Sequence, residues 1–276
     1  MSVIRRATYL GSGEGRRFVL TTEPAGGALR GAVIYIPPFA EELNKSRRMV
    51  ALTAEALAVA GWRVVQPDLY GCGDSAGDFQ DATWRQWCED VETVVTWQLQ
   101  AGGVERVVPW SLRAGALVLS DWLAASGRCL PCLMWQPMPS GKQCLSQFLR
   151  LRTAAEMVRS TGDTAASGNV RQALAEAGVV EVGGYCLGNA LASGLESSAV
   201  RLEPSACPAV RIVEVVAPGR TELSPAVRGM VDRAVAGGCD AVARFIEGPS
   251  FWQTQEIETV PGLTSLTVDL IEELAG

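Results

Sequence analysis

Short apolar runs alternate with amphipathic segments along most of this chain, and this alternation constrains the fold more than any other feature. Continuous apolar runs are typical of strands that are buried on both faces of a sheet. Segments with helical spacing of apolar residues lie between them, which predicts a mostly parallel sheet with helices on both faces, an α/β fold. The predicted strands are residues 31–36, 63–68, 106–110, 130–135, 210–216 and 241–246.

One stretch interrupts this rhythm. Residues 139–205 contain Gly- and Ala-rich helical pieces that look like an insertion. A length of 276 residues suits one α/β domain. We therefore predict a single domain over residues 1–276 with an inserted helical cap at residues 139–205.

Composition excludes several classes of function. The net charge of −6 argues against nucleic-acid binding, which needs a basic face. No apolar run is long enough to span a membrane, and no apolar segment follows Arg5 and Arg6 as in a signal peptide, so a cytoplasmic protein is expected. The eight cysteines are scattered, and both thiols of the Cys129-x-x-Cys132 pair are expected to be structural rather than metal ligands. No cofactor or metal is expected.

Histidine is absent from the chain. The absence excludes an imidazole general base and every histidine-ligated metal site. Ser-His-Asp catalysis is therefore excluded as well.

A strand–turn–helix segment surrounds Arg113. A nucleophile elbow, G-x-S-x-G, has small residues two positions before and after the nucleophile, because strand and helix approach closely there. Ser111 and Gly115 occupy those outer positions here, and Arg113 stands where the nucleophile belongs. Arginine stays protonated and cannot act as a nucleophile.

Several longer motifs resemble one narrower family. They are FAEELNKSRRM at residues 39–49, GCGDSAGDF at 71–79, WQP at 135–137, SGKQ at 140–143 and FWQTQE at 251–256. Together they resemble the second hydrolase family associated with the exosortase A system, over nearly the whole chain. The resemblance implies an α/β-hydrolase fold and a gene neighbourhood of exopolysaccharide production and PEP-CTERM protein sorting.

Two interpretations of Arg113 are open. In the first, Arg113 and the backbone N–H groups of Phe39 and Ala114 receive an anionic ligand at a helix N-terminus. In the second, Arg113 forms an internal ion pair with Glu41, Glu42 or Asp74 and fills the former active site.

Carboxylates could replace the missing triad. Glu41, Asp74 and Glu222, with Glu42 and Asp68 beside them, lie on loops expected at the carboxyl ends of strands, where ligands bind in open α/β sheets. Burial could raise their pKa values enough for general acid or base catalysis. The alternative is that Asp68 and Asp74 cap turns and Glu41 begins a helix.

Other residues near these loops are candidate substrate contacts. Cys72 lies in the Gly-rich loop and is either a reactive thiol or a small filler. Trp110, Trp135 and Trp252 either line an apolar slot for an acyl group or sugar, or belong to the core.

Two functions follow from these features. The first is hydrolysis of an ester or thioester without a Ser-His-Asp triad. The alternative is a catalytically inactive pseudohydrolase that binds a small anionic or acyl molecule, or acts as a scaffold. Apart from that small molecule, the expected partners include at most a second copy of the chain in a homodimer.

Overall fold

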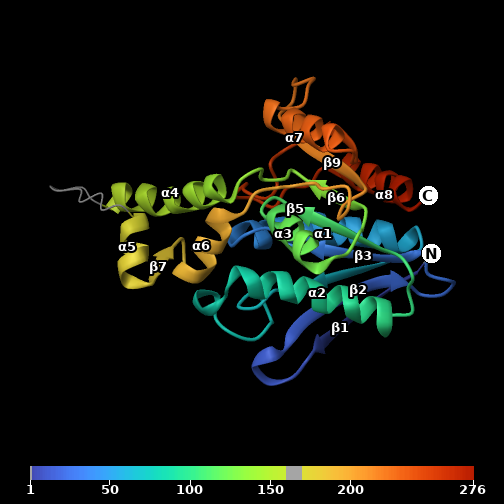
Figure 1. Ribbon diagram of the computed structural model, residues 1–276, viewed down its shortest axis with the longest axis horizontal. Coiled ribbons are helices and arrows are strands. Elements are labelled where there is room, and N and C mark those ends of the chain that lie inside the picture. The colour runs from blue at the N-terminus through green and yellow to red at the C-terminus, as the bar shows by residue number, and fades with distance from the viewer. Residues whose placement is uncertain (1, 160–169) are drawn as a thin grey trace.

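An eight-stranded sheet runs through the molecule in the order β1-β2-β4-β3-β5-β6-β9-β10. Figure 1 shows the computed structural model of the chain, which describes residues 2–159 and 170–276. Six neighbouring strands, from β4 to β10 in this order, are parallel. The mostly parallel sheet predicted from the alternating pattern is confirmed.

Each apolar run identified in the sequence forms one of the parallel strands. Every residue of the three central strands β3, β5 and β6 is buried, in keeping with helices on both faces. The strands are β3 (Gly31–Ile36), β4 (Trp62–Pro67), β5 (Val107–Leu112), β6 (Cys132–Trp135), β9 (Ala209–Val216) and β10 (Asp240–Glu247).

The sheet begins with an antiparallel hairpin that the sequence pattern did not predict. It consists of β1 (Val3–Leu10) and β2 (Arg17–Pro24), which pair along their whole length. β1 is an edge strand in which no residue is fully buried, so it carries no continuous apolar run. β2 joins the hairpin to β4 in antiparallel register.

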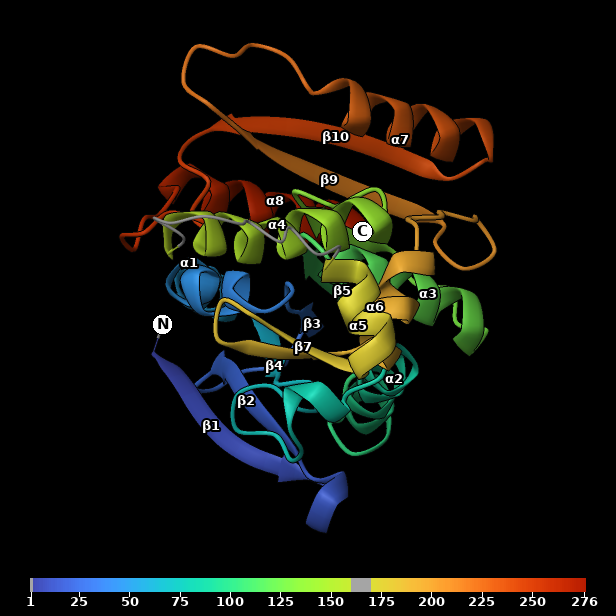
Figure 2. The ribbon, with the colours of Figure 1, turned by 90° about the vertical axis from the view of Figure 1, so that its left-hand side faces the viewer.

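Helices cover both faces of the sheet. Figure 2 shows α1 and α8 on one side and α2, α3 and α7 on the other. Ser224 caps α7 by accepting a hydrogen bond from the Val227 N–H, and Pro225 is the first helical residue. The helices are α1 (Glu41–Val59), α2 (Trp84–Gln100), α3 (Gly115–Ser126), α7 (Pro225–Ala236) and α8 (Pro261–Ala275).

The buried apolar side chains form one cluster on each face. On the side of α1 and α8, Trp110 and Trp135 pack between the sheet and these helices. On the other side, residues of α2, α3 and α7 pack against strands such as β3 and β9. The sheet therefore holds the loops at its carboxyl edge on a rigid base.

Five elements lie between β6 and β9, within the stretch predicted to be a helical cap. They include a small antiparallel hairpin, so this segment is not helical throughout. Figure 2 shows the inserted elements in front of the carboxyl ends of the central strands. The elements are α4 (Gly141–Arg159), α5 (Val170–Ala177), β7 (Val179–Val182), β8 (Tyr185–Gly188) and α6 (Asn189–Ser197).

None of the helices in the described part of the chain is both long and apolar enough to cross a membrane.

Candidate functional site

The elbow between β5 and α3 has the strained backbone of a nucleophile turn. Arg113 has φ +55°, a left-handed conformation that is uncommon for any residue other than glycine. A Cβ atom on Gly115 would lie 2.4 Å from the carbonyl oxygen of Ile36, so only glycine fits there. The predicted strand–turn–helix geometry is present, and its tip carries a guanidinium.

The Arg113 side chain is anchored by Glu42, the second residue of α1. Nε of Arg113 donates to Oε1 and Oε2 of Glu42 over 3.1 and 3.3 Å, and Nη2 lies 3.0 Å from Oε1. The Arg113 guanidinium also lies 5.4 Å from the ring centroid of Trp252, within cation–π range. This is the internal ion pair of the second interpretation, with Glu42 as the acid rather than Glu41 or Asp74.

A cavity of about 280 Å³ opens beside this ion pair. Its wall combines charged groups with aromatic rings, and Phe39 meets Phe148 edge to face at 5.1 Å between centroids. The lining residues are Phe39, Glu41, Glu42, Lys45, Arg113, Cys144, Gln147, Phe148, Leu151, Trp252 and Gln253. The start of α1, the elbow, the loop after β10 and helix α4 of the inserted segment therefore all contribute to one site.

Besides Arg113, one more cation and two helix N-termini lie at the cavity. Lys45 lines the wall, where its ammonium donates to the Gln253 carbonyl and lies 3.5 Å from Glu41. Helices α1 and α3 both begin at this site, and neither has a side-chain N-cap. Their first N–H groups point positive dipole ends toward the same region. Residue Ala40, just before α1, has φ +52° and turns the chain sharply into that helix.

Burial raises the pKa values of two groups in the cavity wall, the Glu42 carboxyl and the Cys144 thiol. Burial raises the pKa of Glu42 above its usual range, although the Arg113 guanidinium opposes this shift. Cys144 on α4 also lines the cavity, and burial raises the pKa of its thiol to about 12. A thiol with such a pKa is protonated at neutral pH and a poor nucleophile.

Five of the residues singled out in the sequence lie around this cavity. Phe39, Glu41, Glu42, Arg113 and Trp252 all line it. Ala114 is the residue after the elbow and is buried at the start of α3.

The Gly-rich loop places Asp74 and Cys72 away from the cavity. Asp74 is exposed, and its N–H donates to the buried Asp68 carboxylate over 2.9 Å. Asp68 thus closes the loop as a turn cap, the structural alternative considered for these acids. Burial raises the pKa of the Cys72 thiol to about 12, which matches a small filler rather than a reactive thiol.

The other candidates are also placed outside the cavity wall. Glu222 lies on the surface, where it pairs with Arg228 over 2.9 Å. Ser111 is fully buried within β5. Trp110 and Trp135 are fully buried in the core, with their rings 4.6 Å apart.

Six of the eleven residues that line the cavity were not singled out from the sequence. Lys45 lies inside the motif at residues 39–49, but its role depends on how α1 starts. Cys144, Gln147, Phe148 and Leu151 follow i, i+3, i+4, i+7 spacing on α4. That spacing marks one face of a helix, although spacing alone does not show what the face covers.

The described residues include no group of histidine, cysteine or acidic side chains that could hold a metal ion. The arrangement can bind an anionic group and an apolar body. It brings no hydroxyl or thiol nucleophile and base together at the elbow.

Comparison with known proteins gives the fold. No family model and no curated protein matches the chain. Among solved structures, Est1E from Butyrivibrio proteoclasticus with bound ferulic acid matches with a TM-score of 0.63 and 15% identity, over 94% of this chain and 95% of that one. Proline iminopeptidase from Mycobacterium smegmatis matches with a TM-score of 0.62 and 17% identity, over 98% and 99%.

A serine hydrolase without a lid from Xanthomonas campestris is also similar, with a TM-score of 0.58 and 13% identity over 98% of this chain and 94% of that one. This chain has the α/β-hydrolase fold. At these identities the likeness concerns the fold alone, because one fold carries many unrelated functions. The function has to be argued from the elbow and its cavity.

Proposed function

We propose that this protein is a pseudohydrolase that binds a small molecule carrying a carboxylate or acyl group in the cavity beside Arg113. The observation that carries the proposal is the guanidinium at the tip of an intact nucleophile elbow. The α/β-hydrolase scaffold is retained, while the position that would attack a substrate holds a permanent cation.

The residue chemistry argues against serine-type hydrolysis. Covalent catalysis needs a nucleophile within reach of a base. The nucleophile position has no hydroxyl or thiol, the Ser111 hydroxyl is buried within β5, and the chain has no histidine. The loop after β10, which follows the elbow in the order of a hydrolase triad, presents the indole of Trp252 to Arg113 instead of an imidazole.

The ligand class follows from the cavity wall. Arginine presents five N–H donors, and Glu42 engages only Nε and Nη2 of Arg113. Within the described part of the chain, Nη1 of Arg113 donates to no acceptor. A carboxylate there would also meet the N-termini of α1 and α3, while Phe39, Phe148 and Trp252 would pack against an acyl or aromatic body.

A second candidate function rests on Glu42. Its raised pKa and its place in the wall allow this carboxyl to donate or accept a proton. Hydrolysis of an ester or thioester without a triad would then use Glu42, with Glu41 nearby. Asp74 and Glu222 are not part of the cavity wall.

The biological setting also belongs to this proposal. The motifs at residues 39–49, 71–79 and 251–256 resemble the exosortase A system-associated family. Two of these motifs supply Phe39, Glu41, Glu42, Lys45, Trp252 and Gln253 of the cavity wall. We therefore place the bound molecule in exopolysaccharide production, with the protein in the cytoplasm.

The experiment combines turnover with binding on the same protein. Purified protein is assayed against a panel of p-nitrophenyl esters and acyl thioesters, and its thermal shift is measured with the matching carboxylic acids. The proposal predicts no turnover above the buffer rate and stabilisation by at least one acid. Turnover that Glu42→Gln abolishes and Asp74→Asn retains would instead support the second candidate, since Asp74 lies outside the cavity.

A further inference from the structure

Three buried cysteines meet at the amino-terminal edge of the sheet. Cys132 is the first residue of β6, Cys207 lies two residues before β9, and Cys239 directly precedes β10. Because β6, β9 and β10 are adjacent and parallel, their starting points lie side by side. The exposed fractions of these residues are 0%, 1% and 3%.

Two of the thiols are in direct contact. The sulfur atoms of Cys132 and Cys207 lie 3.2 Å apart, and the Cys207 thiol also donates to the Ala209 carbonyl oxygen over 3.3 Å. A disulfide bond has a sulfur–sulfur distance of about 2.05 Å, so roughly 1.2 Å of approach would join the first pair. All three cysteines are free in this structure.

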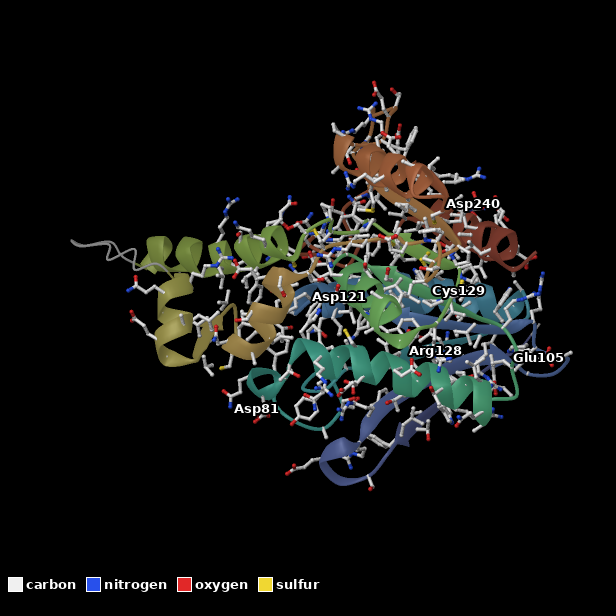
Figure 3. The ribbon with its side chains drawn as sticks, viewed as in Figure 1. Asp81, Glu105, Asp121, Arg128, Cys129 and Asp240 are labelled. Atoms are coloured by element: carbon white, nitrogen blue, oxygen red, sulfur yellow. The ribbon has the colours of Figure 1, made fainter. Side chains whose placement is uncertain are left out.

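This cluster is remote from the cavity at the elbow. Cys129, three residues before Cys132, is labelled in Figure 3 on the side of the sheet away from α4 and α5. The cavity lies at the carboxyl edge, where α4 contributes to its wall. The cysteine cluster is therefore a separate feature, and its role does not depend on the ligand of the cavity.

We propose that Cys132 and Cys207 are a redox modification site at which a peroxide converts the two thiols to a disulfide. One thiolate attacks the peroxide, the O–O bond breaks, and a sulfenic acid and a hydroxide (or alkoxide) leaving group form. The second thiolate attacks the sulfenic sulfur, the S–S bond forms and hydroxide leaves. Two thiols are oxidised by two electrons and one peroxide is reduced, with the protons ending on the departing oxygens.

The bond would close the base of the inserted segment. Cys132 and Cys207 are 75 positions apart in the chain, and every element from α4 to α6 lies between them. The return path is already tied to α3, where the Arg201 N–H donates to Ser120 Oγ over 2.8 Å. A disulfide would add a covalent link from this return path to the start of β6 and would restrict the unfolded chain.

The surroundings make the oxidation slow. Hydrogen bonding with Cys132, together with burial, raises the pKa of the Cys207 thiol. Thiolate is the species that reacts with peroxides, so the pair should react more slowly than a free cysteine at neutral pH. This favours a response to sustained rather than brief oxidant exposure.

The test is peptide mapping of the full chain after incubation with hydrogen peroxide. A Cys129→Ser, Cys186→Ser background removes the two exposed thiols. We expect a mass loss of about 2 Da per chain and a peptide that links Cys132 to Cys207. The oxidised protein should melt up to roughly 8 °C higher, and dithiothreitol should reverse both changes.

Matched variants test whether the disulfide forms between Cys132 and Cys207 and does not involve Cys239. Cys132→Ala and Cys207→Ala should prevent the mass loss, whereas Cys239→Ala should retain it. A link between Cys207 and Cys239, or no link while the sulfurs oxidise to sulfinic acids, would overturn the proposal. Because mapping is done on chains with all three cysteines present, it decides the question even where an alanine variant does not fold.

Discussion

At the scale of single residues, the central feature is the Arg113 guanidinium, for which Glu42 and any anion that enters the cavity compete. Glu42 holds two nitrogens of the guanidinium, so a deprotonated Glu42 competes with an anionic ligand for Arg113 and repels it. Burial raises the pKa of Glu42. The protonation state of this one carboxyl therefore controls how available Arg113 is.

The first prediction concerns the pH dependence of ligand binding. Affinity for a carboxylate should fall as pH rises through the raised pKa of Glu42, because the competing carboxylate forms there. Glu42→Gln should bind several-fold more tightly at pH 8 and should lose this dependence. Titration calorimetry from pH 5.5 to 8 measures both, with Glu222→Gln as a surface control that should match the parent. A parallel pH profile in parent and Glu42→Gln would contradict the competition.

A second prediction at this scale concerns Phe148. Its ring packs edge to face on Phe39 and lines the cavity. Phe148→Ala should weaken binding of an aryl or long acyl carboxylate by about 1–2 kcal/mol while leaving acetate binding unchanged, since only the apolar body loses contacts. Equal losses for both ligands would show that the ring supports the fold rather than the ligand.

At the scale of elements, the close approach of α3 to β3 sets the elbow. A Cβ atom on Gly115 would meet two backbone oxygens, those of Ile36 and Pro37, within 2.7 Å. Backbone cannot move aside as a flexible side chain can. Gly115→Ala should therefore destabilise the protein by about 2–4 kcal/mol in urea unfolding.

The matched control is the same substitution on α7. A Cβ atom on Gly229 would meet only the end of the Arg233 side chain, at 3.4 Å. Gly229→Ala should be neutral or stabilise by up to about 1 kcal/mol, because alanine is the better helix former. If both variants lost the same stability, steric contact at the elbow would not be the cause.

The sequence predicts the buried parallel strands but not the two antiparallel hairpins. Buried parallel strands such as β3 and β5 were predicted because nearly all of their residues are apolar. The hairpin of β1 and β2 was missed, because β1 is half exposed and contains Arg5 and Arg6. The inserted hairpin of β7 and β8 has strands of four residues, too short for a periodic signal.

The sequence likewise predicts only part of the candidate site. Arg113, Phe39 and Glu42 could be placed because the elbow and the start of α1 follow fixed strand ends. Asp74 could not, because its direction depends on the turn that wraps around Asp68. The face of α4 that completes the cavity depends on how the inserted segment docks, which spacing within α4 does not encode.

At the scale of the whole molecule, buried acids shape the stability as pH changes. Asp90 on α2 pairs with Arg17 on β2 over 2.6 Å and accepts the Tyr70 N–H. Burial raises the pKa of Asp90 to about 6, despite these partners. The folded state then keeps a proton that the unfolded state has already released.

The corresponding prediction is a loss of stability between about pH 4 and pH 6. Because the folded state binds more protons in that window, this group makes unfolding more favourable as pH rises. Asp90→Asn should remove this part of the slope, although its overall stability falls because Arg17 loses its partner. Urea unfolding at several pH values gives the slope, and an unchanged slope in Asp90→Asn would contradict the assignment.

The whole scaffold keeps the architecture of a hydrolase while its elbow offers a cation. The most direct test is calorimetric titration of the parent, Arg113→Lys and Arg113→Ala with the carboxylate that gives the largest thermal shift. Loss of a charge-assisted hydrogen bond should weaken binding by about 10- to 100-fold in Arg113→Ala and less in Arg113→Lys. Equal affinity in all three proteins would contradict the account, because Arg113 would then play no part in binding.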